Sequence, residues 1–290
     1  MINRLPAWFK QALPDRVFFQ RMERMNGLKL NTVCKSARCP NITDCLRNNQ
    51  VTFMILGNTC TRGCSFCAVE KAGNNFSPVV DNDPSAIARM VRELDLEFVV
   101  ITSVSRDDLI DGGAGEFARV VEAVRAVNEE VKIEVLIPDF LGNIRSLEII
   151  SDSLPDVIGH NLETIERLYA DLRPQALYQL SLSVLAKIKE LNPRVLTKSS
   201  LMLGLGEKKD EVIEAMRDLR FVGCDILTLG QYLAPSNRHY AVKEFIRPEQ
   251  FQEYRDTALS LGFRAVLSGP KIRSSYQADK LFKEASLCMI

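Results

Sequence analysis

Six of the eight cysteines in this 290-residue chain fall into two groups of three. The upstream triplet has the spacing C-x4-C-x5-C and consists of Cys34, Cys39 and Cys45. The downstream triplet has the spacing C-x3-C-x2-C and consists of Cys60, Cys64 and Cys67. Thiolates spaced this closely on a loop match the ligand pattern of an iron–sulfur cluster. Three thiolates leave one iron of a four-iron cluster without a cysteine, and an open metal position is where chemistry takes place.

Zinc is the main alternative metal for these thiols. Zinc motifs usually pair two C-x2-C knuckles, and within the two triplets only Cys64 and Cys67 have that spacing, so the pattern favours iron–sulfur clusters. No secretory signal is present in the sequence, which favours reduced thiols over disulfides. The two remaining cysteines are isolated. We expect Cys224 to be a small buried residue and Cys288 to have no role in chemistry.

The overall composition is that of an ordinary globular protein, with 46% hydrophobic and 26% charged residues. The 37 basic and 37 acidic side chains cancel, so no global basic field is available to attract nucleic acid. The longest apolar runs have the length of strands and are too short to cross a membrane. With only His160 and His239, the chain has few candidates for acid–base or histidine–metal chemistry.

Short apolar runs alternate with helical patterns from residue 53 onward. Strands are expected at 53–57, 97–103, 132–138, 157–163, 195–205 and 225–233, with a further apolar segment at 263–269. Helices are expected at 83–95, 114–128, 142–152, 178–192, 208–220 and 248–262. The first helix has a start signal, because Asp83 can cap it and Pro84 can occupy its first position. Such alternation indicates a parallel sheet with right-handed crossovers.

The number of strand–helix units fits a complete or partial barrel better than a doubly wound sheet, and no GxGxxG sequence follows the first strand. Ligands of a barrel gather at the carboxyl ends of the strands, and the downstream triplet begins just after the first expected strand. The N-terminal stretch is basic, as in a transit peptide, but Pro6, Pro14 and Asp15 favour an ordered segment that lies across the body of the protein.

The C-x3-C-x2-C spacing at the mouth of such a barrel resembles the signature of the radical S-adenosylmethionine (SAM) superfamily. The resemblance implies that the open iron binds the amino and carboxylate groups of SAM. It also implies that an electron from the cluster cleaves SAM to a 5′-deoxyadenosyl radical. Phe66 matches the superfamily position that packs near the adenine, although an ordinary core aromatic would explain it equally well.

The presence of both triplets, with fourteen residues between them, resembles the lipoyl synthase family. Further stretches from about residue 4 to 276 carry the same resemblance: "RLPAWFKQALP", "FMILGNTCTRGCSFC", "VVITSVSRDDLIDGGA", "IPDF", "HNLET", "LRP", "TKSSLMLGLGE", "LTLGQYLAPS" and "GPKIRSSY". The implied fold is α/β: a partial (β/α)6 TIM-like barrel of the radical SAM type at 51–262. An N-terminal extension at 1–50 would carry the upstream triplet, and a C-terminal extension at 263–290 would carry the "RSSY" motif.

The family resemblance implies sulfur insertion at C6 and C8 of an octanoyl chain. That chain would be amide-linked to a lysine of a lipoyl carrier domain, such as the glycine-cleavage H protein or a 2-oxo-acid dehydrogenase E2 subunit. The two cofactors would be [4Fe-4S] clusters, one binding SAM and one, auxiliary, held by the upstream triplet and consumed as the sulfur donor. The family assigns the fourth auxiliary ligand to the second serine of "RSSY", Ser275. Spacing alone does not separate it from Ser274.

Polar residues near the ends of the expected strands could contact SAM or the carrier, and as candidates we take Thr102, Ser103, Asn161, Glu163, Arg173 and Lys198. Caps or surface ion pairs would explain each of them equally well. In "DDLIDGG", we expect Gly112 and Gly113 to supply unusual dihedrals and the acids Asp107 and Asp108 to be structural.

Two rival functions remain at this stage. One is another radical SAM sulfur-inserting enzyme, similar to biotin synthase, and the other is a two-cluster electron-transfer or scaffold protein without a substrate. For the favoured function we expect a ferredoxin- or flavodoxin-type reductant and an iron–sulfur carrier that rebuilds the auxiliary cluster. We also expect a cytoplasmic monomer that binds neither nucleic acid nor membrane.

Overall fold

The structure is a computed structural model that describes residues 5–9, 13–27, 30–72 and 84–288. Asp83, expected to cap the first helix of the repeat, lies outside the described residues, and α4 begins at Pro84 as expected. No helix in the described part of the chain is long and apolar enough to span a membrane.

The described residues form a parallel sheet of seven strands in the order β1-β4-β5-β6-β7-β8-β9. The strands are β1 (Thr52–Ile55), β4 (Phe98–Ser103), β5 (Lys132–Leu136), β6 (Val157–Gly159), β7 (Leu196–Leu203), β8 (Ile226–Gln231) and β9 (Ala265–Gly269). The predicted α/β fold with parallel strands is confirmed. The sheet also extends past residue 262, where we expected the barrel to end, because β9 pairs with β8 from Ala265 to Gly269.

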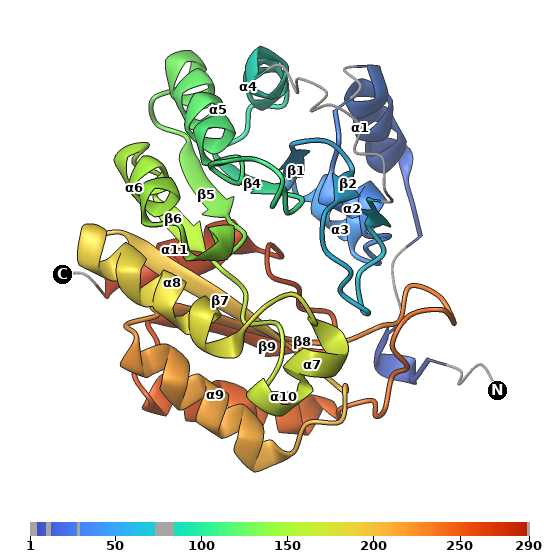
Figure 1. The fold of residues 1–290 in the computed structure, drawn as a ribbon. Helices are drawn as coiled ribbons and strands as arrows, with labels where there is room; N and C mark the ends of the chain where they lie inside the picture. Colours follow the sequence, from blue (N-terminus) through green and yellow to red (C-terminus); the bar gives the residue numbers. More distant parts are fainter. Residues whose placement is uncertain (1–4, 10–12, 28–29, 73–83, 289–290) are drawn as a thin grey trace.

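One long helix follows each of the first six strands of this sheet, and only short elements lie in the loops between them. These helices are α4 (Pro84–Glu93), α5 (Ala114–Val127), α6 (Ile144–Asp152), α8 (Tyr178–Leu191), α9 (Lys209–Phe221) and α10 (Pro248–Ser260). Figure 1 shows α4, α5 and α6 along one half of the sheet and α8, α9 and α10 along the other. Each helix begins and ends within two residues of the prediction, because its apolar spacing marks the face that it buries.

The apolar pattern did not reveal several short elements. They include η1 (Ala7–Phe9) in the N-terminal segment, and η2 (Phe140–Gly142), η3 (Glu166–Leu168) and α7 (Tyr169–Leu172) in the connections of the sheet. Strand β6 is four residues shorter than predicted. It ends at Gly159, and Glu163 takes a left-handed φ of 68°, which extended strand backbone does not allow.

Gly112 and Gly113 have φ angles of 59° and 91°, as expected, and Gly113 precedes α5 directly. A side chain on Gly113 would also collide with Leu56, since an added Cβ would lie 2.1 Å from its Cδ1. Glycine is therefore required at this turn for two reasons.

The N-terminal segment packs beside β1 and brings the upstream triplet to the sheet. It contains α1 (Arg16–Gly27), α2 (Val33–Ser36) and α3 (Ile42–Arg47), which Figure 1 shows next to β1. Thr32 forms an antiparallel bridge with Phe53, and the amide of Met54 donates to the carbonyl of Asn31. Buried Met25, Leu30 and Leu46 join the same hydrophobic core as β1, β4 and β5.

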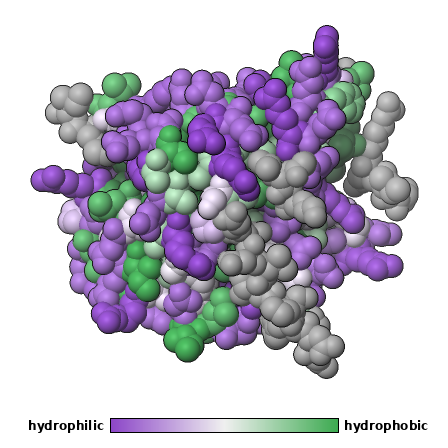
Figure 2. Space-filling view, turned by 90° about the horizontal axis from the view of Figure 1, so that it is seen from above, coloured by the Kyte–Doolittle hydropathy of each residue, from purple (hydrophilic) through white to green (hydrophobic). Residues whose placement is uncertain are grey.

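After β9, the chain turns back across the sheet before α11 (Ala278–Leu287). At Gly230 of β8, an added Cβ would lie 2.0 Å from the carbonyl oxygen of Ile272, so the returning segment rests directly on that strand. Leu281 and Ala285 of α11 then pack against residues at the amino ends of β6, β7, β8 and β9. The face of the molecule seen from above is mostly hydrophilic, with separate small groups of hydrophobic side chains (Figure 2).

Candidate active site

A cavity of about 540 Å³ lies at the carboxyl ends of the strands, and we call it the front cavity. All six cysteines of the two triplets line it, together with Arg273, Ser274, Ser275 and Tyr276 of the C-terminal segment. Of the fourteen residues that the sequence proposed for the site, thirteen line this cavity, and the exception is Lys198. The fold therefore gathers two cysteine groups and a serine motif from three regions of the chain into one space.

Two short parallel strands, β2 (Thr59–Cys60) and β3 (Glu70–Lys71), flank the loop of the downstream triplet. Cys60 is the last residue of β2, and Cys64 and Cys67 lie on the loop itself. The amide of Gly63 donates to Oε1 of Gln175 at 2.6 Å, and the amide of Ser65 donates to the carbonyl of Leu172. The hydroxyl of Thr61 donates to the carbonyl of Ser105 at 3.0 Å. Segments that follow β4 and β6 thus hold this loop from both sides.

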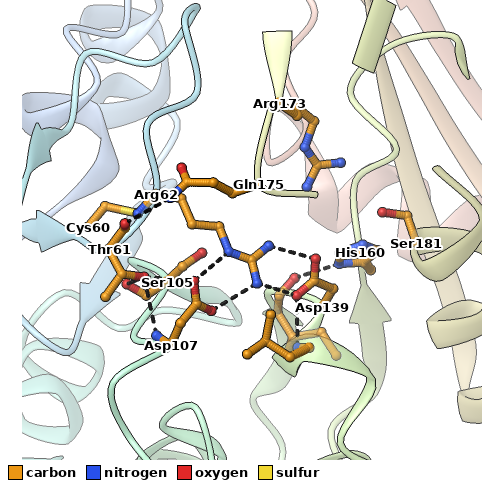
Figure 3. A network of polar contacts seen from close by, with 12 residues as sticks. Cys60, Thr61, Arg62, Ser105, Asp107, Asp139, His160, Arg173, Gln175 and Ser181 are labelled. Carbon is orange, nitrogen blue, oxygen red and sulfur yellow. Dashed lines mark hydrogen bonds and ion pairs between the residues drawn. The ribbon is translucent and has the colours of Figure 1, made fainter. Parts of the chain in front are cut away.

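Arg62, within the same loop, is the centre of a buried ion-pair network (Figure 3). Its Nε and Nη2 donate to the two carboxylate oxygens of Asp107 at 2.8 and 2.9 Å. Its Nη1 and Nη2 donate to those of Asp139, both at 2.6 Å. The side chains of Arg62 and Asp139 are 4% and 0% exposed. This double bidentate arrangement, which we call the Arg62 clamp, ties the cysteine loop to the ends of β4 and β5.

Charge pairing outweighs burial at the Arg62 clamp. Burial opposes ionisation of both partners, but their mutual hydrogen bonds raise the pKa of Arg62 and lower that of Asp139. Both groups therefore stay charged. Asp107 is a partner of Arg62 and Asp108 of Arg106, which agrees with the structural role expected for these acids.

The upstream triplet is held by contacts with the C-terminal segment. Nδ2 of Asn41 donates to the carbonyl of Lys271 at 2.5 Å, across 230 positions of sequence. The hydroxyl of Tyr276 donates to Oδ2 of Asp44 at 2.5 Å. Ser275 therefore lies in a segment fastened on both sides to the region that carries these cysteines, and it lines the front cavity with them.

Asn161 connects the serine motif with Glu163, an acidic residue near the downstream triplet. Its Oδ1 accepts from the hydroxyl of Ser274 at 2.9 Å, and its Nδ2 donates to Oε1 of Glu163 at 3.0 Å. Because the hydroxyl of Ser274 already makes this hydrogen bond, Ser275 is the better candidate of the two serines to bind a cluster. Burial raises the pKa of Glu163, and the charge of nearby Arg173 opposes that rise.

Two residues that line the front cavity each have a buried polar atom without a hydrogen-bond partner among the described residues: Oγ of Ser103 and Nε of Arg173. Such atoms are costly unless a ligand or water satisfies them. Nη1 of Arg173 is already engaged by the hydroxyl of Tyr169 at 2.9 Å. The hydroxyl of Thr102 donates to the carbonyl of Leu136 at 2.8 Å. Ser103 and Arg173 are therefore better placed than Thr102 to bind a polar ligand.

Lys198 has a different environment from the one that sequence reasoning gave it. Its ammonium donates to both carboxylate oxygens of Glu134 at 2.8 Å, and both side chains are 1% exposed. The residue does not line the front cavity and its charge is already neutralised. The sequence could not show this pairing, because Glu134 and Lys198 are 64 positions apart.

Comparison with known proteins identifies the class. Residues 54–219 match the Radical SAM superfamily, and the chain belongs to it. The FeFe-hydrogenase maturase HydG from Carboxydothermus hydrogenoformans has a similar fold, with a TM-score of 0.60 at 14% identity. The match covers 93% of this chain and 60% of that one.

Curated relatives identify the family within this class. A lipoyl synthase of Caldanaerobacter subterraneus subsp. tengcongensis is 48% identical over 279 residues, covering 96% of this chain and 97% of the relative. A lipoyl synthase of Geotalea uraniireducens is 50% identical over 281 residues, covering 96% and 98%. The chain belongs to the lipoyl synthase family, whose members are sulfur-inserting radical SAM enzymes, and the prediction made from the motifs is confirmed.

The superfamily implies a [4Fe-4S] cluster and SAM, and the residues present fit both. The downstream triplet offers three soft thiol ligands that line the front cavity. A polar ligand such as SAM could satisfy the unpaired atoms of Ser103 and Arg173. Burial raises the pKa of Cys64 and raises that of Cys67 to about 11. Binding to iron would overcome this rise, because a coordinated thiol is deprotonated. Within the described residues, no three His, Cys, Asp or Glu side chains are arranged to share a single metal ion.

Proposed function

We propose that this chain inserts two sulfur atoms, at C6 and C8, into an octanoyl-lysine borne by a lipoyl carrier domain. The downstream triplet would hold the [4Fe-4S] cluster that binds SAM. The upstream triplet, with Ser275, would hold a second, auxiliary [4Fe-4S] cluster. The observation that carries the proposal is that both triplets and Ser275 line one cavity. A substrate in this cavity would therefore face both cysteine triplets.

The bound cofactors supply the chemistry that side chains cannot: hydrogen-atom abstraction from unactivated carbon by way of SAM, and sulfur from the auxiliary cluster. The protein itself binds, orients and shields. Arg62 and its two carboxylates fix the downstream loop, and Arg173, Ser103 and Glu163 offer polar contacts to SAM. Phe66 lines the same cavity, where it could pack near the adenine.

The walls of the front cavity also suit an acyl chain. Apolar side chains line it alongside the polar groups, among them Met54, Leu136, Met202, Leu233 and Ile272. Sites of this kind bind mostly by apolar contact, with a few polar groups that set the orientation. A fatty acyl chain carried in by a protein-bound lysine fits this lining.

Ser275 is proposed as the fourth ligand of the auxiliary cluster. A hard oxygen ligand is a poor match for iron in a sulfide cluster, which suits a cluster that must open and release sulfur. We further propose that the carrier is a glycine-cleavage H protein or a 2-oxo-acid dehydrogenase E2 domain. A ferredoxin- or flavodoxin-type protein would supply electrons and an iron–sulfur carrier would rebuild the cluster, with the enzyme working as a cytoplasmic monomer.

Anaerobic reconstitution with iron and sulfide tests the proposal. We expect about eight irons per chain, as two four-iron clusters. Cys60→Ala should abolish formation of 5′-deoxyadenosine. Cys39→Ala should keep SAM cleavage but form no lipoyl product from an octanoyl-lysine peptide. Cys288→Ala, outside both triplets, is the matched control and should behave as wild type.

Three outcomes of this experiment would contradict the proposal. Loss of SAM cleavage in both Cys60→Ala and Cys39→Ala would remove the separate roles of the triplets. A fully loaded wild-type protein that forms no 5′-deoxyadenosine would favour an electron carrier or scaffold. A different sulfur-containing product would favour another radical SAM sulfur inserter.

A further inference from the structure

Ser274, the first serine of the "RSSY" motif, has no part in the proposed auxiliary cluster, and its position differs from that of Ser275. Ser275 lines the front cavity and also a second cavity, which it shares with Cys34 and Cys45. Of these two cavities, Ser274 lines only the front one. Its hydroxyl donates to Oδ1 of Asn161 at 2.9 Å, across 113 positions of sequence. The two neighbouring serines therefore contact different parts of the site.

The side chain of Asn161 links Ser274 to Glu163. Its Nδ2 donates to Oε1 of Glu163 at 3.0 Å. The main chain of Glu163 is held separately by β7. Its amide donates to the carbonyl of Ser200 at 2.9 Å, and its carbonyl accepts from the amide of Met202 at 2.8 Å. Strand β7 thus fixes the main chain of Glu163, and Asn161 orients its carboxylate.

The orientation of the Asn161 amide depends in turn on the hydroxyl of Ser274. Only the nitrogen end of a side-chain amide donates, so Nδ2 must point to the carboxylate of Glu163 and Oδ1 must point to Ser274. Without the hydroxyl, Oδ1 would lose its partner, and the amide could turn away from Glu163. Two hydrogen bonds in series therefore connect the C-terminal segment to this carboxylate.

Glu163 lies beside the groups that we assign to SAM. It lines the front cavity together with Arg173, whose Nε has no hydrogen-bond partner among the described residues. Nη1 of Arg173 donates to the main-chain carbonyl of Asn161 at 3.2 Å. Burial is the main cause that raises the pKa of Cys64, and the charge of nearby Glu163 adds to it. A cationic group bound here would meet a carboxylate whose direction depends on Asn161.

We propose that Ser274 is a positioning residue for SAM, because through Asn161 it orients the carboxylate of Glu163. Its neighbour Ser275 keeps the separate role of a ligand at the upstream triplet. The inference rests on the proposed binding of SAM at the downstream triplet, and it does not require the auxiliary cluster.

This role connects SAM binding to the seating of the C-terminal segment. Hydrogen bonds from Asn41 and Tyr276 fasten that segment to the region of the upstream triplet. A correctly seated segment holds Ser274 against Asn161 and so strengthens SAM binding. Since coupling between two binding equilibria is reciprocal, bound SAM stabilises the seated segment by the same free energy.

SAM affinity in protein without the upstream cluster tests the role of Ser274. Cys39→Ala removes that cluster, and the downstream cluster is reconstituted to about four irons per chain. In this background, Ser274→Ala should weaken SAM binding about tenfold, because the carboxylate is no longer oriented. The matched control is Ser268→Ala, which removes a hydrogen bond of 2.7 Å to the carbonyl of Phe251 and lines neither cavity. Equal SAM affinities in the two serine variants would overturn the proposal.

A double-mutant cycle separates positioning from a general loss of structure. In an Asn161→Ala background, Ser274→Ala should have no further effect on SAM affinity, because the link to Glu163 is already absent. Ser274→Thr retains the hydroxyl and should restore most of the affinity. A second loss of about tenfold in the Asn161→Ala background would show that Ser274 acts by another route, against the proposal.

A measurement on the metal-free protein does not depend on any cofactor. NMR of isotope-labelled protein reports how fast the Nδ2 protons of Asn161 exchange with water, and their signals are assigned by their absence in Asn161→Asp. Ser274→Ala should make this exchange faster, whereas Ser268→Ala should leave it unchanged. Unchanged exchange in Ser274→Ala would show that the hydroxyl does not hold the amide, and the proposal would fail.

The two kinds of failure are distinguishable. If the wild-type protein with a filled downstream cluster binds no SAM, the proposed function fails, and the role of Ser274 fails with it. If the protein binds SAM but Ser274→Ala matches Ser268→Ala in affinity and in proton exchange, only the role of Ser274 fails.

Discussion

The downstream triplet lies on one short segment, the end of β2 and the loop that follows it, whereas the upstream triplet depends on two segments 230 positions apart that meet only in the folded protein. The loop is fixed by the Arg62 clamp, in which a fully buried carboxylate accepts two charged hydrogen bonds. The upstream site is closed by single hydrogen bonds, such as those from Asn41 and Tyr276. The firmer construction holds the site that must keep its geometry, and the looser one holds the site proposed to be dismantled and refilled.

Breaking the Arg62 clamp should give the largest loss of stability, because it removes the interaction that fixes the downstream loop. Arg62→Met leaves Asp139 buried and unpaired, which should lower the free energy of unfolding by about 3–5 kcal/mol. Urea unfolding of the metal-free protein measures this, and iron analysis should show loss of the downstream cluster. Arg106→Met, which unpairs the 27% exposed Asp108, is the control. Equal losses of stability in the two variants would contradict a special role for the clamp.

Lowering the pH should reduce the free energy of unfolding because of His160, which Figure 3 shows near Asp139. Its Nδ1 lies 3.0 Å from the carbonyl oxygen of Ile137, and burial lowers its pKa from 6.5 to about 4. The unfolded chain binds this proton more readily, so the stabilisation is complete above pH 6.5 and is lost as the pH falls towards 4. The gap between these pKa values corresponds to about 3 kcal/mol.

Urea unfolding between pH 4 and pH 7 measures the effect of His160. Replacement by Gln should remove the part of the pH dependence that this histidine contributes. If the slope between pH 4 and 6.5 were the same in wild type and His160→Gln, the histidine would have to bind its proton as readily in the folded protein as in the unfolded chain.

Weakening the contacts of the upstream site should give the smallest loss of stability. It should also cause iron to be lost from that site and not from the downstream one. Tyr276→Phe removes a hydrogen bond to the carboxylate of Asp44, which should cost about 1–2 kcal/mol. Hydrogen exchange should increase in residues 270–276, and iron should be lost faster from the upstream triplet. The downstream cluster and SAM cleavage serve as the internal control. If both clusters lost iron at the same rate, the two sites would not be independent.

The sequence predicted the local pattern well and the long-range pairings poorly. The bounds of the six helices between the strands were within two residues, because an apolar stripe at helical spacing reports its own buried face, whereas α1 and α11 were not predicted. The cysteine triplets were found because their spacing is visible along the chain, whereas the serine motif was found only through the family resemblance. Lys198 was one candidate to offer charge to SAM, with an ion pair as the equal alternative, and the structure shows an ion pair with Glu134.

Sequence reasoning missed the Arg62 clamp, although two signals for it were present. Arg62 lies inside the cysteine loop, and Asp107 and Asp139 each follow the end of one of two strands that prove to be adjacent, β4 and β5. Parallel neighbours bring such residues together at one edge of the sheet. The strand order had to be known first, because the partners lie 45 and 77 positions from Arg62.

The hydrogen bond between Asn41 and Lys271 also determines when the upstream site can close during translation. Ribosomes add about 5–20 residues per second, so the upstream thiols leave the ribosome roughly 10 to 50 s before the segment that closes their site. During that interval Cys34, Cys39 and Cys45 are exposed on a growing chain. Cells that make this protein under oxygen must therefore protect these thiols before the last residues are translated.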